Sequence, residues 1–362
     1  MWWIGRSSVT SKIRQIGRFM AKSSENATVH PPVLGIYSGQ DLMGDGLFKL
    51  PFFRAARAAF PDYRIVYVTS GPTMLETKLR PLVSGIIDVF ISNTGICRSI
   101  GELIRPLPIQ EKFSVFIDTQ PVLWRTLLLR RLRHDLFITP AAHYRLSDRR
   151  PSEGRVRPVN ITLRLIELIE LASGRPVDMR LDVAVPPDFL EKARRQCPLG
   201  SVYVGLAPGA GGRGKCWPLE NYIALARKLV DAGRIPVFVL GPAELEWLPQ
   251  IREAVPRSLF PLQDEAVWGG GYDPVATVAL ARSFAAAVSN DSGTNHMFAA
   301  ANIPLLTLFG PSNAEKFRPL VKCGVVLKAQ DFGGSLPSDI PVSAVESSLE
   351  TLLSSDVSSS YN

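Results

Sequence analysis

A glycine-rich segment in the second half of the chain has the residue types that bind phosphate. It runs from Gly205 to Pro218 and reads Gly-Leu-Ala-Pro-Gly-Ala-Gly-Gly-Arg-Gly-Lys-Cys-Trp-Pro. The pattern predicts a strand end, a turn with glycines at positive φ, and a helix whose first residue is Pro218. N–H groups at a helix start attract anions. The predicted phosphate contacts are Ala210, Gly211, Gly212 and Lys215. A solvated turn is the alternative, because the Lys-Ser/Thr of a P-loop is absent.

A second cluster of polar residues follows an apolar run that begins near residue 285. It consists of Asp291, Ser292, Gly293, Thr294 and His296, directly before a small-residue helix. Helix capping alone would explain one such residue, but five of them crowd one turn. In open α/β sheets, ligands bind at the carboxyl ends of strands. The cluster therefore predicts a binding site.

A third motif lies near the start of the chain, in Met43-Gly-Asp-Gly-Leu-Phe-Lys-Leu-Pro51, followed by Phe60-Pro61. A carboxylate in this position, directly after the first predicted strand, can accept a proton from a hydroxyl group. The alternative is that Asp45 caps a helix that begins at Leu47.

In their order and separation these motifs, with Leu308-Phe-Gly-Pro-Ser312, resemble glycosyltransferase family nine, the lipopolysaccharide heptosyltransferase family. The similarity extends over roughly residues 33–353. It implies an α/β chain with the GT-B fold, in which two Rossmann-like doubly wound domains face a central cleft. It also implies Asp45 as the catalytic base. Asp41 is the fallback candidate, and Lys215 and Asp291 complete the catalytic set. For this reaction Asp291 is expected to contact sugar hydroxyls, and Gly293 and Thr294 the phosphate. His296 either assists the diphosphate or orients Asp291.

The resemblance implies an inverting transferase without a metal or other cofactor. Its expected partners are a nucleotide-sugar donor, ADP-heptose by family, and a glycolipid acceptor of the lipopolysaccharide core. Glu244 is similar to a family position that meets the nucleoside, and is otherwise a surface helix residue. Tyr272 is a candidate for stacking on the nucleobase, with packing as the alternative. The rival functions are a transferase using a different sugar nucleotide, an epimerase, and a nucleotide- or glycan-binding protein without turnover.

Composition agrees with this class. The 362 residues carry a net charge of +8, which favours an anionic partner, and no nucleic-acid-reading motif is visible. The four cysteines have no metal-ligand spacing, which fits a reducing compartment. No apolar run is long enough to span a bilayer. We expect a cytoplasmic protein that is peripheral at the inner face of the cytoplasmic membrane.

Two basic segments are candidates for membrane contact. Residues 1–24 contain five Lys or Arg and no acid, behind Trp2 and Trp3. They predict either an interfacial helix or a disordered tail. The segment from Leu123 to His134 either faces lipid or forms an ordinary amphipathic surface helix.

The predicted organisation has a basic tail at 1–30, an acceptor-side domain at 31–190, a nucleotide-sugar domain at 198–340 and a crossover helix with a frayed end at 341–362. Apolar runs predict strands at 33–37, 64–69, near 89, 114–118, 201–207, 235–240, 285–290 and 304–309. Predicted helices cover 47–59, 73–81, 161–172, 219–230 and 342–353. Residues 140–160 are expected to form a mobile loop, and 186–199 the inter-domain linker.

Overall fold

The structure is a computed structural model that describes residues 31–179, 181 and 183–357. The predictions for the basic tail, including Trp2 and Trp3, lie outside the described residues. None of the described helices is long and apolar enough to cross a membrane.

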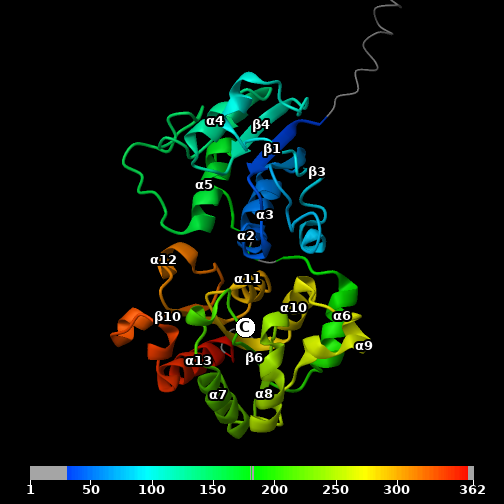
Figure 1. The fold of residues 1–362 in the computed structure, drawn as a ribbon, viewed down its shortest axis with the longest axis vertical. Coiled ribbons are helices and arrows are strands. Elements are labelled where there is room, and N and C mark those ends of the chain that lie inside the picture. Colours follow the sequence, from blue (N-terminus) through cyan, green and yellow to red (C-terminus); the bar gives the residue numbers. More distant parts are fainter. Residues whose placement is uncertain (1–30, 180, 182, 358–362) are drawn as a thin grey trace, which may run out of the picture. The chain divides into compact units, whose positions relative to one another are not determined.

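The first half of the described chain is built on a five-stranded parallel sheet (Figure 1). Its strand order is β3-β2-β1-β4-β5. The strands are β1 (Val33–Ser38), β2 (Arg64–Thr69), β3 (Val89–Ile91), β4 (Phe113–Asp118) and β5 (His134–Ile138). All of β1 is buried, as expected for a central strand of a parallel sheet.

The second half repeats this design. Its parallel sheet has the order β10-β9-β8-β6-β7. The strands are β6 (Tyr203–Ala207), β7 (Ile235–Phe238), β8 (Phe284–Asn290), β9 (Leu305–Phe309) and β10 (Gly324–Lys328). The predicted pair of doubly wound α/β units is therefore confirmed. β5 and β10, each the last strand of its sheet, were not predicted.

Helices and short 3₁₀ turns connect these strands. The helices are α2 (Met43–Phe48), α3 (Leu50–Ala59), α4 (Leu123–Leu129), α5 (Ile161–Ser173), α6 (Pro187–Gln196), α7 (Leu219–Asp231), α8 (Leu248–Ala254), α9 (Glu265–Trp268), α10 (Pro274–Ala281), α11 (Gly293–Ala300), α12 (Ala314–Phe317) and α13 (Val342–Val357). The 3₁₀ turns are η1 (Arg80–Val83), η2 (Ile100–Ile104), η3 (Arg213–Lys215), η4 (Pro242–Trp247), η5 (Pro261–Gln263), η6 (Ala329–Phe332) and η7 (Pro337–Asp339).

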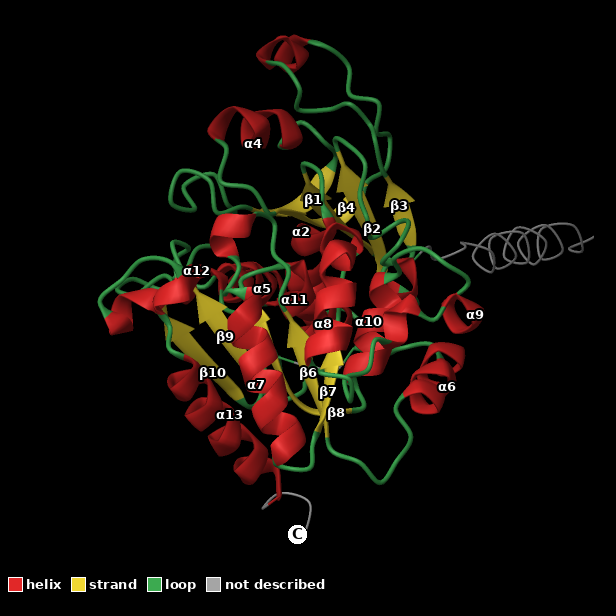
Figure 2. Cartoon of the chain, turned by 60° about the horizontal axis from the view of Figure 1, so that its bottom comes forward, coloured by secondary structure: helices red, strands yellow, loops and turns green. Residues whose placement is uncertain are grey.

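Helices cover both faces of the second sheet (Figure 2). Leu206 and Val288 pack in the same buried cluster as residues of α7 and α13. The next residue of β6, Ala207, and the preceding residue of β8, Ala287, pack instead with residues of α10 and α11. The side chains of each strand therefore alternate between the two covered faces. Because all strands of this sheet run parallel, their carboxyl ends lie at one common edge.

Each sheet reverses its strand order at one point, between β1 and β4 in the first and between β6 and β8 in the second. Ligands of doubly wound proteins bind outside the carboxyl ends of strands at such switch points. The three predicted site segments follow β1, β6 and β8. The topology therefore places all of them at switch points. The two edges also meet, because α2 contacts α11, and the Asn160 side chain donates to the Arg318 carbonyl at 2.9 Å.

Several predicted elements are corrected. The predicted helix at 73–81 is absent, and only η1 is helical there. Thr73 instead forms a β-bridge with Asp41, and its hydroxyl accepts from the N–H of Leu75. Pro81 further disfavours helix at the residue before it.

The expected linker at 186–199 is mostly the helix α6, which packs against α10 and is tied by a 2.8 Å hydrogen bond from Gln196 to Asp264. The final helix extends to Val357, past its predicted end at 353, and residues 358–362 lie outside the described chain. Its main contacts are with β8, β9, β10 and α7 of its own sheet, rather than across the domain boundary.

Residues 140–160 are a loop, as predicted, and ion pairs hold it to α5. Arg155 pairs with Glu167 and Glu170, and Arg149 donates to the carbonyls of Leu171 and Ala172 at the end of that helix.

Candidate active site

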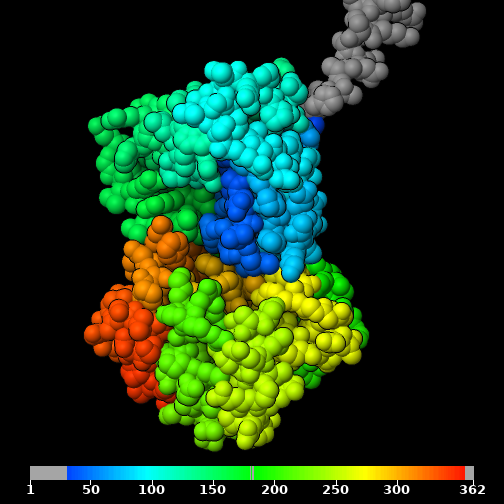
Figure 3. All heavy atoms as spheres, in the orientation of Figure 1, coloured from blue at the N-terminus to red at the C-terminus, as the bar shows by residue number. Residues whose placement is uncertain are grey.

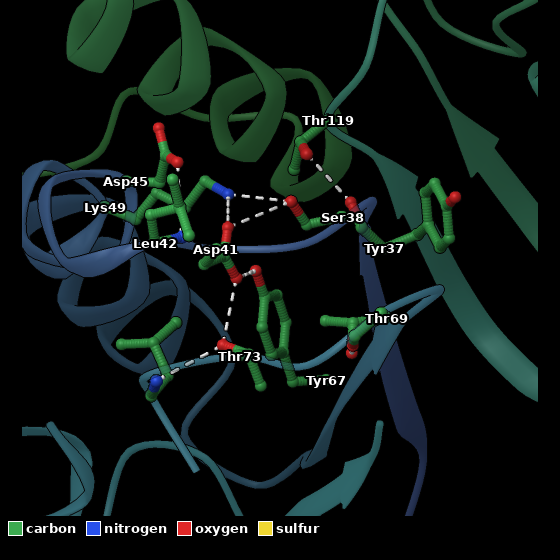
Figure 4. A network of polar contacts seen from close by, with 12 residues as sticks. Tyr37, Ser38, Asp41, Leu42, Asp45, Lys49, Tyr67, Thr69, Thr73 and Thr119 are labelled. Carbon is green, nitrogen blue, oxygen red and sulfur yellow. Dashed lines mark hydrogen bonds and ion pairs between the residues drawn. The ribbon is translucent and has the colours of Figure 1, made fainter. Parts of the chain in front are cut away.

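The first wall of the site is the helix α2, which carries Asp45. The sequence predicted a helix from Leu47, but α2 begins at Met43, so Asp45 lies in its first turn. Its carboxylate accepts the N–H of Leu42 at 3.2 Å. Asp45 therefore caps this helix, and its side chain stays partly exposed at the sheet edge (Figure 4).

Beneath α2 lies a buried polar network centred on Asp41 (Figure 4). The Asp41 carboxylate forms an ion pair with Lys49 and accepts from Tyr67, from Ser38 at 3.2 Å and from Thr73 at 3.1 Å. Lys49 also donates to Ser38 at 2.7 Å. Burial, followed by the Asp41 charge, raises the pKa of Tyr67 well above its usual value, so its hydroxyl keeps its proton. Because Asp41 is enclosed and fully partnered, it cannot serve as the fallback base.

The same edge contains a second buried carboxyl group, Asp118 at the end of β4. It accepts from the hydroxyls of Thr126 at 2.6 Å and Thr139 at 3.0 Å, and from the N–H of Gln120 at 2.9 Å. Burial raises the pKa of Asp118 to about 6, although these hydrogen bonds act in the opposite direction. Asp118 was not recognised from the sequence.

The second wall is the glycine-rich turn after β6. Gly211, Gly212 and Gly214 face open space, and their N–H groups donate no hydrogen bond to any residue in the described part of the chain. None of the glycines in the turn has φ in the left-handed region; Gly212, at 177°, is extended. The predicted use of positive φ is therefore wrong. The small size of these residues leaves the backbone N–H groups open to an incoming ligand.

Asn290, at the end of β8, holds this turn in place. Its amide nitrogen donates to the carbonyls of Pro208 at 2.8 Å and Gly209 at 3.4 Å, and its oxygen accepts from the N–H of Trp217 at 2.9 Å. Pro218 is the N-cap of α7 rather than its first residue. Sequence reasoning missed the role of Asn290, because nothing local reveals which strand end lies beside the turn.

The turn and the start of α11 come together as predicted. The Lys215 ammonium lies 3.5 Å from the Asp291 carboxylate, a loose ion pair in which Lys215 is half exposed. Ser292 caps α11 by accepting from the N–H of Asn295 at 3.4 Å. The N–H groups of Gly293 and Thr294, in the first turn, have no partner within the helix.

His296 links the two walls. Its ring centroid is 6.3 Å from that of Phe48 on α2. Burial lowers the pKa of His296, while the nearby carboxylates of Asp291 and Asp45 oppose this shift. Asp45 and Asp291 thus both lie within electrostatic reach of one imidazole, although they belong to different sheets.

A cavity of about 390 Å³ opens beyond the end of β7. Leu240, Trp268 and Tyr272 are among its lining residues. The Tyr272 hydroxyl donates to the Met297 sulfur at 3.1 Å, and burial raises the pKa of Tyr272. Such an apolar wall with one polar end suits a planar ring.

Glu244 lies next to this cavity, in η4. A Cβ atom at Gly209 would lie 2.5 Å from the Glu244 carboxylate carbon, so the glycine permits the close approach of this side chain. Among the described residues, no three His, Cys, Asp or Glu side chains are grouped as metal ligands.

Comparison with known proteins agrees with this architecture. The model of glycosyltransferase family 9 (heptosyltransferase) matches residues 109–333. Over 128 residues the chain is 34% identical to lipooligosaccharide heptosyltransferase 2 of Haemophilus influenzae. That alignment covers 34% of this chain and 36% of the relative's length.

Two solved structures share the fold. The family 9 glycosyl transferase of Veillonella parvula superposes with a TM-score of 0.66, 19% identity and coverage of 89% of this chain and 97% of that one. The E. coli heptosyltransferase WaaC with ADP superposes with a TM-score of 0.63 and 18% identity. That alignment covers 88% of this chain and 100% of the WaaC chain.

Two doubly wound parallel sheets, with site residues at both switch points, define a protein of the GT-B fold. Within that class, the match over more than half of its residues shows that the chain belongs to glycosyltransferase family 9 (heptosyltransferase). The matched residues include the glycine-rich turn and α11, whereas Asp45 precedes them.

Proposed function

We propose that this protein is an inverting, metal-independent glycosyltransferase that transfers heptose from ADP-heptose to the lipopolysaccharide core or a related envelope glycolipid. Family membership supports the class of reaction. The matched relative is named a heptosyltransferase, and two similar structures were determined with ADP and with ADP-2-deoxy-2-fluoro heptose. The observation that carries the proposal is the pairing of an open, cationic glycine-rich turn with a carboxylate on the facing edge.

In the proposed reaction, the acceptor hydroxyl attacks the anomeric carbon from the face opposite the diphosphate. Asp45 accepts the hydroxyl proton as the new C–O bond forms. The bond between the anomeric carbon and the diphosphate oxygen breaks, and the electron pair leaves with ADP. Attack from the opposite face inverts the anomeric configuration.

Negative charge grows on the diphosphate as it departs. Lys215 and the free N–H groups of Gly211, Gly212 and Gly214 are proposed to stabilise that charge, which is stronger in the transition state than in the bound donor. The N–H groups at the start of α11 add to them. Burial lowers the pKa of His296 and so favours the neutral imidazole, which is proposed to donate one hydrogen bond to the diphosphate.

The remaining residues are assigned to the donor sugar and nucleoside. Asp291 accepts hydrogen bonds from sugar hydroxyls once the diphosphate draws Lys215 away from their 3.5 Å pair. Glu244 is proposed to meet the ribose, and Tyr272 the nucleobase in the cavity of about 390 Å³. Because the acceptor is lipid-linked, we place the protein in the cytoplasm, peripheral at the inner face of the membrane.

The test is a transfer assay with full-length protein, ADP-heptose and a heptose-deficient lipopolysaccharide acceptor, with and without chelator. We expect ADP release and a product whose new linkage has the opposite anomeric configuration to the donor. A thermal-shift panel of sugar nucleotides runs beside it, since a ligand at ~100 times Kd stabilises by ~2.7 kcal/mol. Selective stabilisation by another sugar nucleotide would favour the alternative donor. Binding without any transfer would favour the inactive binding protein.

A further inference from the structure

The 3₁₀ turn η2 and the helix α4 present apolar side chains to solvent. Ile100 and Ile104 are 67% and 89% exposed, and Leu123 and Leu127 are 53% and 43% exposed. Leu123 and Leu127 are four residues apart, so they lie on one stripe of α4. We name these four residues, with the arginines around them, the η2–α4 surface. Figure 3 shows the cyan part of the chain, which includes η2, on the surface of the molecule.

Packing and hydrogen bonds fix the two elements of this surface to each other and to the core. The two elements pack against each other. The Arg131 guanidinium donates to the carbonyls of Glu102 and Arg105, both at 2.8 Å. Leu103 and Trp124 pack against the buried cluster that contains Leu128. The inward faces of both elements therefore pack against the core, whereas the four outward apolar side chains are 43% to 89% exposed.

The charged residues close in sequence to the exposed apolar residues are mainly basic. Residues 92–110 and 119–134 contain six arginines and one acidic residue, Glu102. The Glu102 carboxylate is occupied by the N–H groups of Cys97, Arg98 and Ser99, at 2.8 to 2.9 Å. Arg98 and Arg105 are exposed, and Arg130 is paired with Asp148. Exposed apolar side chains near such arginines match the interface of a bilayer with an anionic surface.

We propose that the η2–α4 surface binds an anionic lipid bilayer, with the four apolar side chains in the headgroup region and the arginines on lipid phosphates. This rests on the proposed function in one respect, that the acceptor is anchored in the same bilayer. α4 begins shortly after β4 ends, and Thr119, between them, donates to the carbonyl of Tyr37 in β1 at 2.8 Å. The surface thus continues from the edge that carries Asp45.

The experiment is co-sedimentation of the full chain with vesicles of phosphatidylcholine alone or mixed with phosphatidylglycerol. One variant removes apolar contact, Ile104→Glu with Leu127→Glu, and one reverses charge, Arg98→Glu with Arg105→Glu. The control, Leu199→Glu with Arg257→Glu, alters an exposed leucine and an exposed arginine of the second half. We expect both surface variants to bind anionic vesicles at least about ten-fold more weakly than wild type, and the control to bind normally.

Vesicle binding does not require turnover, so this result stands apart from the transfer assay. Transfer to a water-soluble, delipidated acceptor is expected to be unchanged in all variants, while KM for the vesicle-borne acceptor rises in the two surface variants. Wild-type binding by both surface variants would overturn the proposal and assign any membrane contact elsewhere in the chain. Equal binding of wild type to neutral and anionic vesicles would also overturn it.

Discussion

The two sheet edges that meet at the site, one in each half of the chain, differ in how their charged side chains are buried and paired. On the first edge, Asp41 and Lys49 are buried together and partnered by hydroxyls. On the second, Lys215 and Asp291 are 3.5 Å apart and partly exposed, beside N–H groups that donate to no residue within 31–179, 181 and 183–357. The charges of the first edge are satisfied within the protein, whereas those of the second remain open to solvent. Under the proposed function, the first edge holds a carboxylate in place and the second receives the diphosphate of the donor.

The largest effect is expected on the first edge. Lys49→Met leaves the Asp41 carboxylate buried without its cation, which typically costs about 3–5 kcal/mol. Denaturant unfolding should show this loss, and adding Asp41→Asn should recover part of it. Lys112→Met, which breaks an exposed pair with Asp135, is the control and should cost under about 1 kcal/mol. An equal loss of unfolding free energy in Lys49→Met and Lys112→Met would contradict the view that the Asp41–Lys49 pair is a buried, structural pair.

On the second edge, Lys215→Ala should leave stability nearly unchanged and weaken ADP binding about ten-fold, because a half-exposed lysine contributes mainly to the ligand. Turnover at saturating donor should fall as well. Calorimetry with ADP measures the first effect. Lys228→Ala, an exposed lysine of α7 paired with Glu346, is the control. Unchanged ADP affinity in Lys215→Ala would contradict a contact between Lys215 and the diphosphate.

The pH dependence of stability should be set in part by Asp118. Burial raises its folded pKa from 3.8 to about 6, so between these values the folded state keeps a proton that the unfolded state releases. The stability that this group contributes is present below pH 3.8 and is lost as pH rises through 6. Asp118→Asn should flatten this decline in thermal melts, whereas Asp62→Asn, at an exposed position, should not. An unchanged slope in Asp118→Asn would contradict the assignment.

The smallest expected effect concerns Gly209. An alanine there places Cβ 2.5 Å from the Glu244 carboxylate carbon, and this flexible side chain can move away at little cost to stability. We expect a several-fold loss of ADP affinity with an unchanged melting temperature. If displacement of Glu244 is the cause, Gly209→Ala should add nothing to Glu244→Ala in a double-mutant cycle. Additive losses of ADP affinity would show that Gly209 and Glu244 affect binding independently.

Residue patterns predicted the strands best where they are central and buried. The apolar runs of β1 and β8 predict buried strands, and both strands are almost entirely buried in the structure. β5 and β10 were missed because neither is a continuous buried run: β5 opens with His134 and Asp135, and no residue of β10 is fully buried. The segment predicted as a linker at 186–199 is mostly the helix α6, with Pro186 and Pro187 at its start, where proline is tolerated.

Of the site, the turn and the α11 cluster were predictable because their chemistry is local. The Asp41 network was not, since Tyr67 and Thr73 reach Asp41 only through the pairing of β1 with β2 and the turn beyond it. Asn290 was hidden for the same reason. It stabilises a turn 82 residues earlier in the chain, at Pro208.

The assignment of Asp45 as the catalytic base is tested most directly by comparing donor binding with turnover in Asp45→Asn. The amide keeps the size of the side chain and an oxygen that can accept the Leu42 N–H, but it cannot take the acceptor proton. We expect wild-type affinity for ADP-heptose by calorimetry, a normal melting temperature and a loss of turnover of at least ~100-fold. Near-normal turnover in a folded, donor-binding Asp45→Asn protein would contradict the assignment of Asp45 as the base, and with it the division of roles between the two edges.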